Sequence, residues 1–311
     1  MNKESCAYVS FGEIGRLGRL ANQMFQYAAL YALADKLNCN MIINYDNENI
    51  LDLPGVPTHQ ILNIHQTFDL SAGRENHIPT FRQNNWNCIR NESMRIYNQV
   101  FPGEFVGWFK ENTHHYDPTL FECPPFINLT GFYQDEKYFR HIKDKIKKEF
   151  TFKKEVMDRA KEVTTQALQE SSKYDRLAAL HVRRTDLLDI QIPTPSINYY
   201  MEAISHLDPE YKFIVCSDDI KWCKETFEFM GDRFFFSEEN HFVDLCMMSL
   251  CDHHIIANSS FSWWSAWLSE NENKKIFYPD VWWAEHQDIF YRNGDGEHSM
   301  CPAEWTCLES K

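Results

Sequence analysis

Several motifs of common enzyme classes are missing from this chain. Neither Gly-x-Ser-x-Gly nor Gly-Lys-Ser/Thr occurs in its 311 residues, which excludes a hydrolase nucleophile elbow and a P-loop. Asp-x-Asp, a frequent holder of divalent metal ions, is also absent. Asp218-Asp219 are consecutive and so point in different directions, and His253-His254 have no third ligand at suitable spacing. The sequence therefore predicts no metal and no other cofactor.

Basic residues and long apolar runs are scarce. Lys and Arg number 31 against 45 Asp and Glu, for a formal net charge of −14. This balance argues against nucleic acid or an anionic membrane as a partner of the whole protein, while one local basic cleft stays compatible with it. The longest apolar patch near the start, Met24 to Leu37, is interrupted by Gln26, Asp35 and Lys36. Because it is too short to cross a bilayer, we expect no membrane span.

The ten cysteines form no C-x-x-C pair. Cys216, Cys246 and Cys251 lie in apolar sequence, where a free Cys behaves as a small hydrophobic residue. This favours reduced thiols and a cytoplasmic protein. A disulfide between Cys301 and Cys307 is an alternative left open for the tail.

Hydrophobic patterning indicates an α/β protein. Short apolar runs alternate with segments of helical periodicity, which is typical of parallel sheets with crossover helices. We expect strands at 7–11, 41–43, 126–129, 177–182, 212–216, 234–236, 252–257 and 275–278. Helices are expected at 22–38, 138–170, 197–206, 220–230, 241–249 and 262–269. The charged helical region separates two predicted α/β domains, residues 1–160 and 161–311.

The segment His181-Val182-Arg183-Arg184-Thr185-Asp186 follows a predicted buried strand. Arg is rarely buried without a partner, and guanidinium groups match phosphate oxygens well. In one interpretation, Asp186 is an internal partner in a structural ion pair. In the other, the two arginines clamp an anion. These six residues alone favour neither.

Three more segments lie where a predicted strand meets a predicted helix. Asn22 follows a glycine-punctuated loop and is either a helix N-cap or a ligand-facing residue. In Ser217-Asp218-Asp219, either Ser217 or Asp218 caps the following helix, or the carboxylates meet a ribose or base hydroxyl. Ser259-Ser260-Phe261 open a helix, where hydroxyl and N–H groups form an anion cradle.

In this order, the segments resemble the α-1,2-fucosyltransferases of glycosyltransferase family 11. The family's His-x-Arg-Arg-x-Asp motif matches His181 to Asp186 in full, and Ser217–Asp219 and Ala257–Leu268 match well. Asn22 to Tyr27 match too, whereas Ala21 stands where the family usually has Gly. The resemblance extends from Gly15 to about Trp305.

The resemblance implies a GT-B-like fold, with two Rossmann-like domains facing a central cleft. The C-terminal domain would hold GDP-fucose and the N-terminal domain the acceptor. The implied reaction is an inverting, metal-independent transfer of L-fucose from GDP-β-L-fucose to the 2-hydroxyl of a galactose-terminated glycan. Animal relatives carry a Golgi anchor. This chain looks like a soluble bacterial or viral version, and the Golgi lumen applies if an anchor has been removed.

The resemblance also implies two catalytic residues. Arg183 would bind the β-phosphate and neutralise the departing GDP. Asn22 would reach the diphosphate or the fucose from the opposite domain. No motif identifies the general base of the reaction. Asp46 is our candidate for it, because it follows the second predicted strand of the acceptor-side domain.

Donor binding is implied for a larger set. His181 and Asp186 would shape the arginine loop, and Arg184 would orient it. Asp244 would accept hydrogen bonds from guanine N–H groups, and Phe261 would pack on the donor. The remaining predicted donor ligands are Ser217, Asp219, Ser259 and Ser260, the last two as partners of phosphate oxygens.

Two alternatives stay open. One is a fucosyltransferase of another linkage or with a protein acceptor. The other is a catalytically silent nucleotide-sugar or glycan-binding protein, against which the intact arginine pair argues, because a plain lectin needs no diphosphate clamp. Trp86 and Trp108 either stack on sugar faces or pack within their loops.

Overall fold

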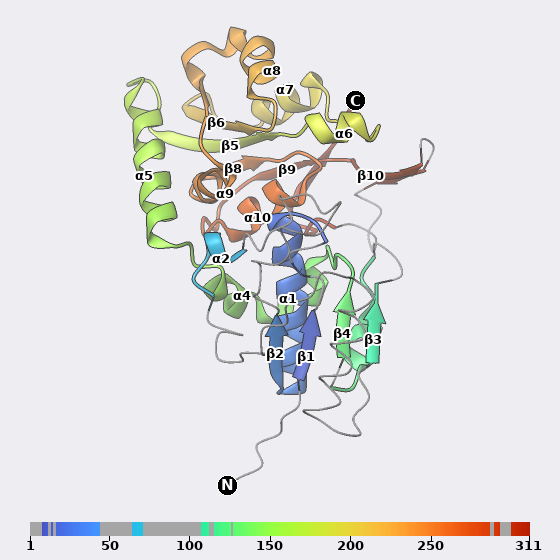
Figure 1. Cartoon of the computed structure of the whole chain (residues 1–311). Helices are drawn as coiled ribbons and strands as arrows, with labels where there is room; N and C mark the ends of the chain where they lie inside the picture. Colours follow the sequence, from blue (N-terminus) through green and yellow to red (C-terminus); the bar gives the residue numbers. More distant parts are fainter. Residues whose placement is uncertain are drawn as a thin grey trace, which may run out of the picture. The chain divides into compact units, whose positions relative to one another are not determined.

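The computed structural model describes residues 8–11, 14, 17–43, 64–70, 107–111, 115–125, 127–286, 289–292 and 300–311. The chain divides into two compact units, Met1–Thr151 and Phe152–Lys311 (Figure 1). The boundary predicted at 160/161 falls inside helix α5 (Lys154–Gln169) and is corrected to the segment before it. Val156, Ala160 and Val163 of α5 pack in the core of the second unit, so the whole helix belongs there.

The first unit is built on a parallel four-stranded sheet with the order β2-β1-β4-β3. Its strands are β1 (Tyr8–Phe11), β2 (Asn40–Ile43), β3 (Gly107–Lys110) and β4 (Ile127–Thr130). Its helices are α1 (Leu20–Leu37), α2 (Ile64–Thr67) and α4 (Lys143–Glu149), with 3₁₀ turns at Pro118–Glu122, Glu136–Tyr138 and Arg140–Ile142. Helix α1 is rich in Ala and Leu and largely buried, and it ends at Asn38, whose left-handed backbone (φ 48°) stops the helix.

The second unit contains a parallel six-stranded sheet with the order β12-β9-β8-β5-β6-β7. Its strands are β5 (Arg176–Val182), β6 (Tyr211–Ser217), β7 (Phe234–Phe236), β8 (His253–Ile255), β9 (Ile276–Pro279) and β12 (Thr306–Leu308). Its helices after α5 are α6 (Thr185–Asp189), α7 (Ile197–Ser205), α8 (Ile220–Thr226), α9 (His241–Ser249) and α10 (Ser260–Leu268), with a 3₁₀ segment at Glu228–Arg233. A separate antiparallel hairpin joins β10 (Val281–His286) to β11 (Ile289–Arg292).

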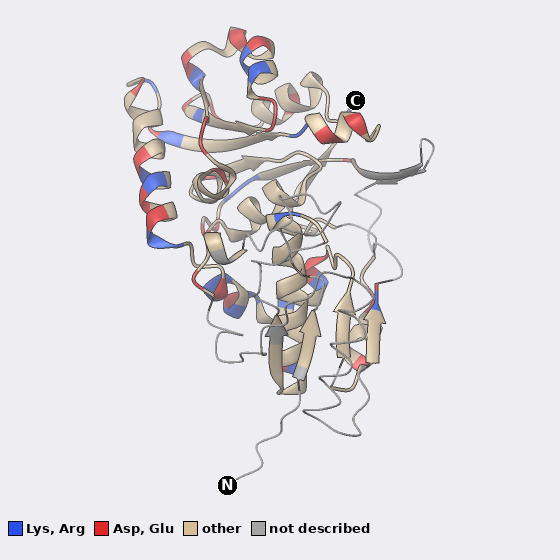
Figure 2. Ribbon diagram, in the orientation of Figure 1, with Lys and Arg blue, Asp and Glu red and all other residues tan. Residues whose placement is uncertain are grey.

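Helices cover both faces of the six-stranded sheet. Successive side chains of a strand point to opposite faces, and the β5 side chains on both faces are buried. Leu177 and Ala179 pack with residues of α5 and α9. Leu180 and Val182 pack on the other face with residues of α7 and α8. Basic and acidic residues alternate along α5 (Figure 2), and exposed ion pairs join Lys154 to Asp158 and Arg159 to Glu162.

Each sheet reverses its strand order at one point. In the second unit the chain runs from β5 outward to β6 and β7, then returns to β8 on the other side of β5. In the first unit it runs from β1 to β2, and β4 later pairs with the other side of β1. Ligands of open α/β sheets bind outside the carboxyl ends of the strands at such a switch point. The switch points lie between β5 and β8 and between β1 and β4.

Every strand expected from the sequence is present, and some helix predictions need correction. The predicted helix 138–170 is two 3₁₀ turns followed by α4 and α5, with buried Phe150 at the break between the two helices. The predicted helix 220–230 ends at Thr226. No disulfide joins any of the eight cysteines that the structure describes, so the pairing of Cys301 with Cys307 is wrong.

Candidate functional site

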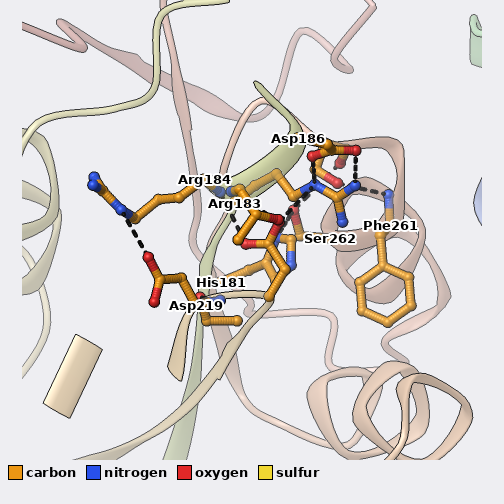
Figure 3. Close-up of polar contacts among 11 residues, drawn as sticks. His181, Arg183, Arg184, Asp186, Asp219, Phe261 and Ser262 are labelled. Atoms are coloured by element: carbon orange, nitrogen blue, oxygen red, sulfur yellow. Dashed lines mark hydrogen bonds and ion pairs between the residues drawn. The ribbon is translucent and has the colours of Figure 1, made fainter. Parts of the chain in front are cut away.

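The switch point between β5 and β8 brings two of the sequence motifs into contact. His181, near the end of β5, has its Nδ1 3.0 Å from the Oγ of Ser262 in α10, and its ring lies 5.5 Å from that of Phe261 (Figure 3). Burial, and then the charge of Arg183, lower the pKa of His181 to about 3. His181 is therefore a neutral ring at physiological pH that ties the end of β5 to the start of α10.

The Arg183 side chain lies just beyond β5 and is held by two carboxylates. Its Nε donates to Oδ1 of Asp186 at 2.8 Å, and its Nη2 forms an ion pair with Oδ2 of the same residue. The Nε also lies 3.3 Å from Oδ2 of Asp218. Within the described part of the chain, its Nη1 has no hydrogen-bond partner. The internal Arg183–Asp186 pair is confirmed, and it leaves one N–H corner of the guanidinium available to an anion.

Arg184 points away from Arg183 (Figure 3). Its guanidinium lies 3.8 Å above the ring of Trp222, and its Nε is 3.5 Å from Oδ2 of Asp219. A guanidinium on an aromatic face beside a carboxylate is already well stabilised. The two adjacent arginines therefore do not form a joint clamp.

Asp218 and Asp219 follow β6 and do different work. Asp218 accepts from the backbone N–H of Arg184 at 2.9 Å and of Thr185 at 3.2 Å, and from the Thr185 hydroxyl at 2.6 Å. Asp219, rather than Ser217 or Asp218, is the N-cap of α8 and accepts from the N–H of Trp222 at 3.2 Å. The Oγ of Ser217 accepts from the N–H of Asp219 at 2.9 Å. These contacts fix the arginine loop from the neighbouring strand.

The arginine cluster carries no net positive charge, because the two guanidiniums are paired with the carboxylates of Asp186, Asp218 and Asp219. Attraction of an anion must then rest on directed N–H groups. The start of α10 presents such groups in its first turn, where Ser259 is the N-cap and Ser260 the first helical residue, although the N–H of Phe261 already donates to Ser259 Oγ at 3.3 Å. Backbone N–H groups of such a first turn favour negative charge.

Asp244 lies in α9, which follows β7 in the chain and contacts β6. The hydroxyl of Ser237 donates to its Oδ1 at 2.5 Å, and burial raises its pKa to about 6. Cys216 of β6, which the register pairs with His181, also interacts with this carboxyl. Arg183, Ser259 and Asp244 thus all lie near the carboxyl ends of the central strands.

In the first unit, Asn22 is placed near the switch point between β1 and β4. Arg19 is the N-cap of α1, so the N-cap interpretation of Asn22 is wrong. Instead, its Oδ1 accepts from Nε2 of Gln134 at 2.6 Å. Asp46 and Trp86 lie outside the described residues, and Trp108 is 48% exposed on β3.

The site prediction omitted several residues that hold these side chains. Asp218, Trp222, Ser262 and Ser237 contact predicted site residues directly. Asp218 was recognisable as part of the Ser-Asp-Asp turn, but the others depend on contacts between distant segments. Within the described ranges, no group of three or more His, Cys, Asp or Glu is placed to hold a metal ion. The metal-free site therefore stays a prediction.

The sequence model of glycosyl transferase family 11 matches residues 115–298, which is more than half of the chain. The chain belongs to glycosyltransferase family 11. This confirms the resemblance found in the sequence. The family match includes Arg183 and its carboxylates, the Ser217–Asp219 turn, Asp244 and the start of α10.

Two curated relatives of this family 11 chain cover most of it. The alpha-1,2-colitosyltransferase of Escherichia coli is 29% identical over 308 residues, which are 94% of this chain and 97% of the relative. Galactoside alpha-(1,2)-fucosyltransferase 1 of Alouatta belzebul is 25% identical over 300 residues, which are 85% of this chain and 70% of the relative.

The crystal structure of POFUT1 in complex with GDP is similar with a TM-score of 0.52 and 15% identity, covering 88% of this chain and 99% of that chain. At this identity the likeness concerns the fold alone. It confirms the predicted α/β, GT-B-like fold class. The cleft between the two domains stays a prediction.

No helix in the described part of the family 11 chain combines the length and the hydropathy needed to cross a bilayer.

Proposed function

We propose that this family 11 protein transfers L-fucose from GDP-β-L-fucose to the 2-hydroxyl of a galactose-terminated glycan, with inversion. The observation that carries the proposal is the β5/β8 switch point, where the open corner of Arg183 and the first turn of α10 lie at the carboxyl ends of adjacent strands. A diphosphate needs several directed donors, and both groups provide them. The names of the relatives supply the sugar and the linkage.

The diphosphate is held by the second unit. Nη1 of Arg183 donates to the β-phosphate, and Ser259 and Ser260 hold further phosphate oxygens. Asp186 and Asp218 grip the other side of the guanidinium, so its open corner has a fixed direction before the donor arrives. Phe261, which lies against His181, packs on the donor.

The remaining contacts of the donor lie on both sides of the diphosphate. Asp244 accepts hydrogen bonds from guanine N–H groups, which requires the ionised carboxylate. Ser217 and Asp219, at the carboxyl end of β6, lie beside the ribose. Arg184 lies on the ring of Trp222 and helps to hold the arginine loop in position. Asn22 contacts the diphosphate or the fucose from the first unit.

The reaction is a single displacement. The donor is β-linked and the product α-linked, so the acceptor oxygen attacks while the bond from fucose to the β-phosphate oxygen breaks. Arg183 stabilises the negative charge that develops on the departing GDP, an effect of about 10²–10³ in rate for one such donor. His181 is neutral, with its pKa lowered to about 3, and does not protonate the leaving group. The acceptor proton goes to a general base, for which Asp46 is our candidate.

A second candidate function differs only in the donor sugar. The colitosyltransferase relative matches nearly the whole chain, and colitose is fucose without its 3-hydroxyl. A site that hydrogen-bonds this hydroxyl rejects the deoxy sugar by about 10⁴-fold, whereas a site that leaves it in solvent accepts both.

The test is incubation with GDP-fucose and a panel of galactosides and non-galactosides, followed by mass and linkage analysis of the products. We expect one added fucose, α-1,2-linked to galactose, and release of GDP. A second arm offers the nucleotide-linked colitose. Transfer of colitose but not fucose supports the second candidate. Hydrolysis alone, a different linkage, or transfer only to non-galactosides contradicts the main proposal.

A further inference from the structure

The segment Gly131–Gln134 is an unusual turn at the switch point of the first unit. It directly follows β4, and the chain adopts positive φ angles at Gly131 (143°) and Tyr133 (54°). A bulky residue at positive φ costs about 1–3 kcal/mol and persists only where the surroundings enforce it. Contacts with neighbouring residues must therefore hold the turn in this conformation.

The side chain of Glu111 holds the turn by accepting hydrogen bonds from the backbone of the turn. Its Oε2 accepts from the N–H of Phe132 at 2.6 Å, and its Oε1 accepts from the N–H of Tyr133 at 3.0 Å. A Cβ on Gly131 would lie only 2.5 Å from the Cβ of Glu111, so the turn and the carboxylate fit together only with glycine at this position. Both oxygens of Glu111 are engaged, which suits an anchor rather than a proton acceptor.

Tyr133 fixes the same turn from inside the unit. Its side chain is fully buried, and its hydroxyl lies 3.1 Å from the carbonyl oxygen of Phe109 and 3.2 Å from that of Thr130. The ring also meets Phe11 of β1 edge to face, at 5.8 Å between centroids. The turn is thus attached to β1, β3 and β4 at once.

The turn delivers Gln134 to Asn22. Nε2 of Gln134 donates to Oδ1 of Asn22 at 2.6 Å, joining β4's exit to the first turn of α1. This contact selects one of the two orientations of the Asn22 amide, with Oδ1 toward Gln134 and Nδ2 toward Gly18. The bridge spans the β1/β4 switch point as the His181–Ser262 contact spans β5/β8.

We propose that Gln134 is a positioning residue that orients the Asn22 amide, and that Glu111 is the anchor that holds Gln134 in place. The proposal rests on the proposed function, in which Asn22 contacts the donor. In the selected orientation, Asn22 offers N–H groups, which suits an oxygen of the diphosphate or the sugar. Loss of the bridge lets the amide rotate and present its oxygen instead.

Three variants test this pair. Gln134→Leu removes the donor, and we expect kcat to fall about tenfold, the worth of one hydrogen bond. Gln134→Glu places a carboxylate against Oδ1 of Asn22 and should lower kcat further than Leu does. Glu111→Gln turns one backbone contact into a donor–donor clash and should resemble Gln134→Leu. Glu122→Gln, the same change at an exposed residue of the first unit, is the control and should leave kcat unchanged.

A double-mutant cycle with Asn22→Ala separates positioning from general stability. If Gln134 acts through Asn22, adding Gln134→Leu to Asn22→Ala lowers kcat no further, and KM for the acceptor stays constant in all four proteins. Additive losses overturn the proposal, as does a loss that follows the melting temperature rather than the bridge.

A second readout does not need activity. In a ¹H–¹⁵N spectrum, the Asn22 side-chain amide signals should shift in Gln134→Leu and Glu111→Gln but not in Glu122→Gln. Unmoved signals overturn the positioning role even in an active enzyme. Absence of fucose transfer by the wild type refutes the proposed function instead, and the spectra still decide whether Gln134 orients Asn22.

Discussion

Replacement of Arg183 by Ala is the perturbation for which the structure gives the sharpest expectation. Two of the three guanidinium nitrogens are engaged by Asp186 and Asp218, and Nη1 is left for the donor. The variant therefore removes one charge-assisted contact to the leaving diphosphate. We expect kcat to fall about 10²–10³-fold, or roughly 3–4 kcal/mol in the activation barrier.

The same change should barely affect the fold. The Asp186 side chain is 40% exposed, so water can solvate it once its partner is gone. We expect the free energy of unfolding to fall by about 1 kcal/mol, as for other partly exposed ion pairs. Arg183→Lys keeps the charge, but its ammonium group cannot bind both oxygens of Asp186 and the donor at the same time. The kcat of this variant should therefore lie between those of wild type and Arg183→Ala.

The assay is steady-state GDP release with GDP-fucose and the best galactoside, together with urea unfolding of each protein. Arg159→Ala is the matched control, because Arg159 is also paired with two carboxylates but lies on the outer surface of α5. Turnover of the Arg183→Ala protein within a few fold of wild type refutes the diphosphate role. A loss explained by unfolding refutes the claim that the fold survives.

Three further expectations concern different parts of the account. Gly18→Ala should lower kcat strongly and should also lower the melting temperature, because Gly18 has a φ of 87°, which strains any residue with a Cβ, and that Cβ would lie 2.2 Å from Nδ2 of Asn22. The pKa of Asp244 is raised to about 6 by burial, so GDP affinity measured by calorimetry should fall about tenfold per pH unit below pH 6 as the carboxyl becomes neutral, and Asp244→Asn should remove this dependence. Transfer should persist in excess EDTA, and a loss restored only by Mn²⁺ would contradict the metal-free proposal.

The second unit could be predicted from sequence because its signals are local. The apolar run ending at Val182 is a buried parallel strand, and the Ser-rich turn after β8 opens a helix as expected. Both motifs follow neighbouring strands, so their contact required only the correct strand order. Short elements such as α6 and β12 were missed, because three to five residues carry too little periodicity to be recognised.

The Glu111–Gln134 anchor was out of reach of the sequence for a different reason. Its contacts depend on the register of β3 with β4, which pairs Lys110 with Thr130 and so places Glu111 beside Gly131. The strand β3 was not predicted, and its four residues show no pattern that would reveal its partner. The sequence also did not predict that the Arg183 and Arg184 side chains point in opposite directions, because two adjacent arginines suggest a single charged patch.

A crystal structure of the protein with GDP tests the central claim most directly. The account predicts the β-phosphate within hydrogen-bond distance of Nη1 of Arg183, a second phosphate contact at the first turn of α10, and guanine against Asp244. A diphosphate bound elsewhere, or Arg183 still contacting only Asp186 and Asp218 while GDP is present, would contradict it.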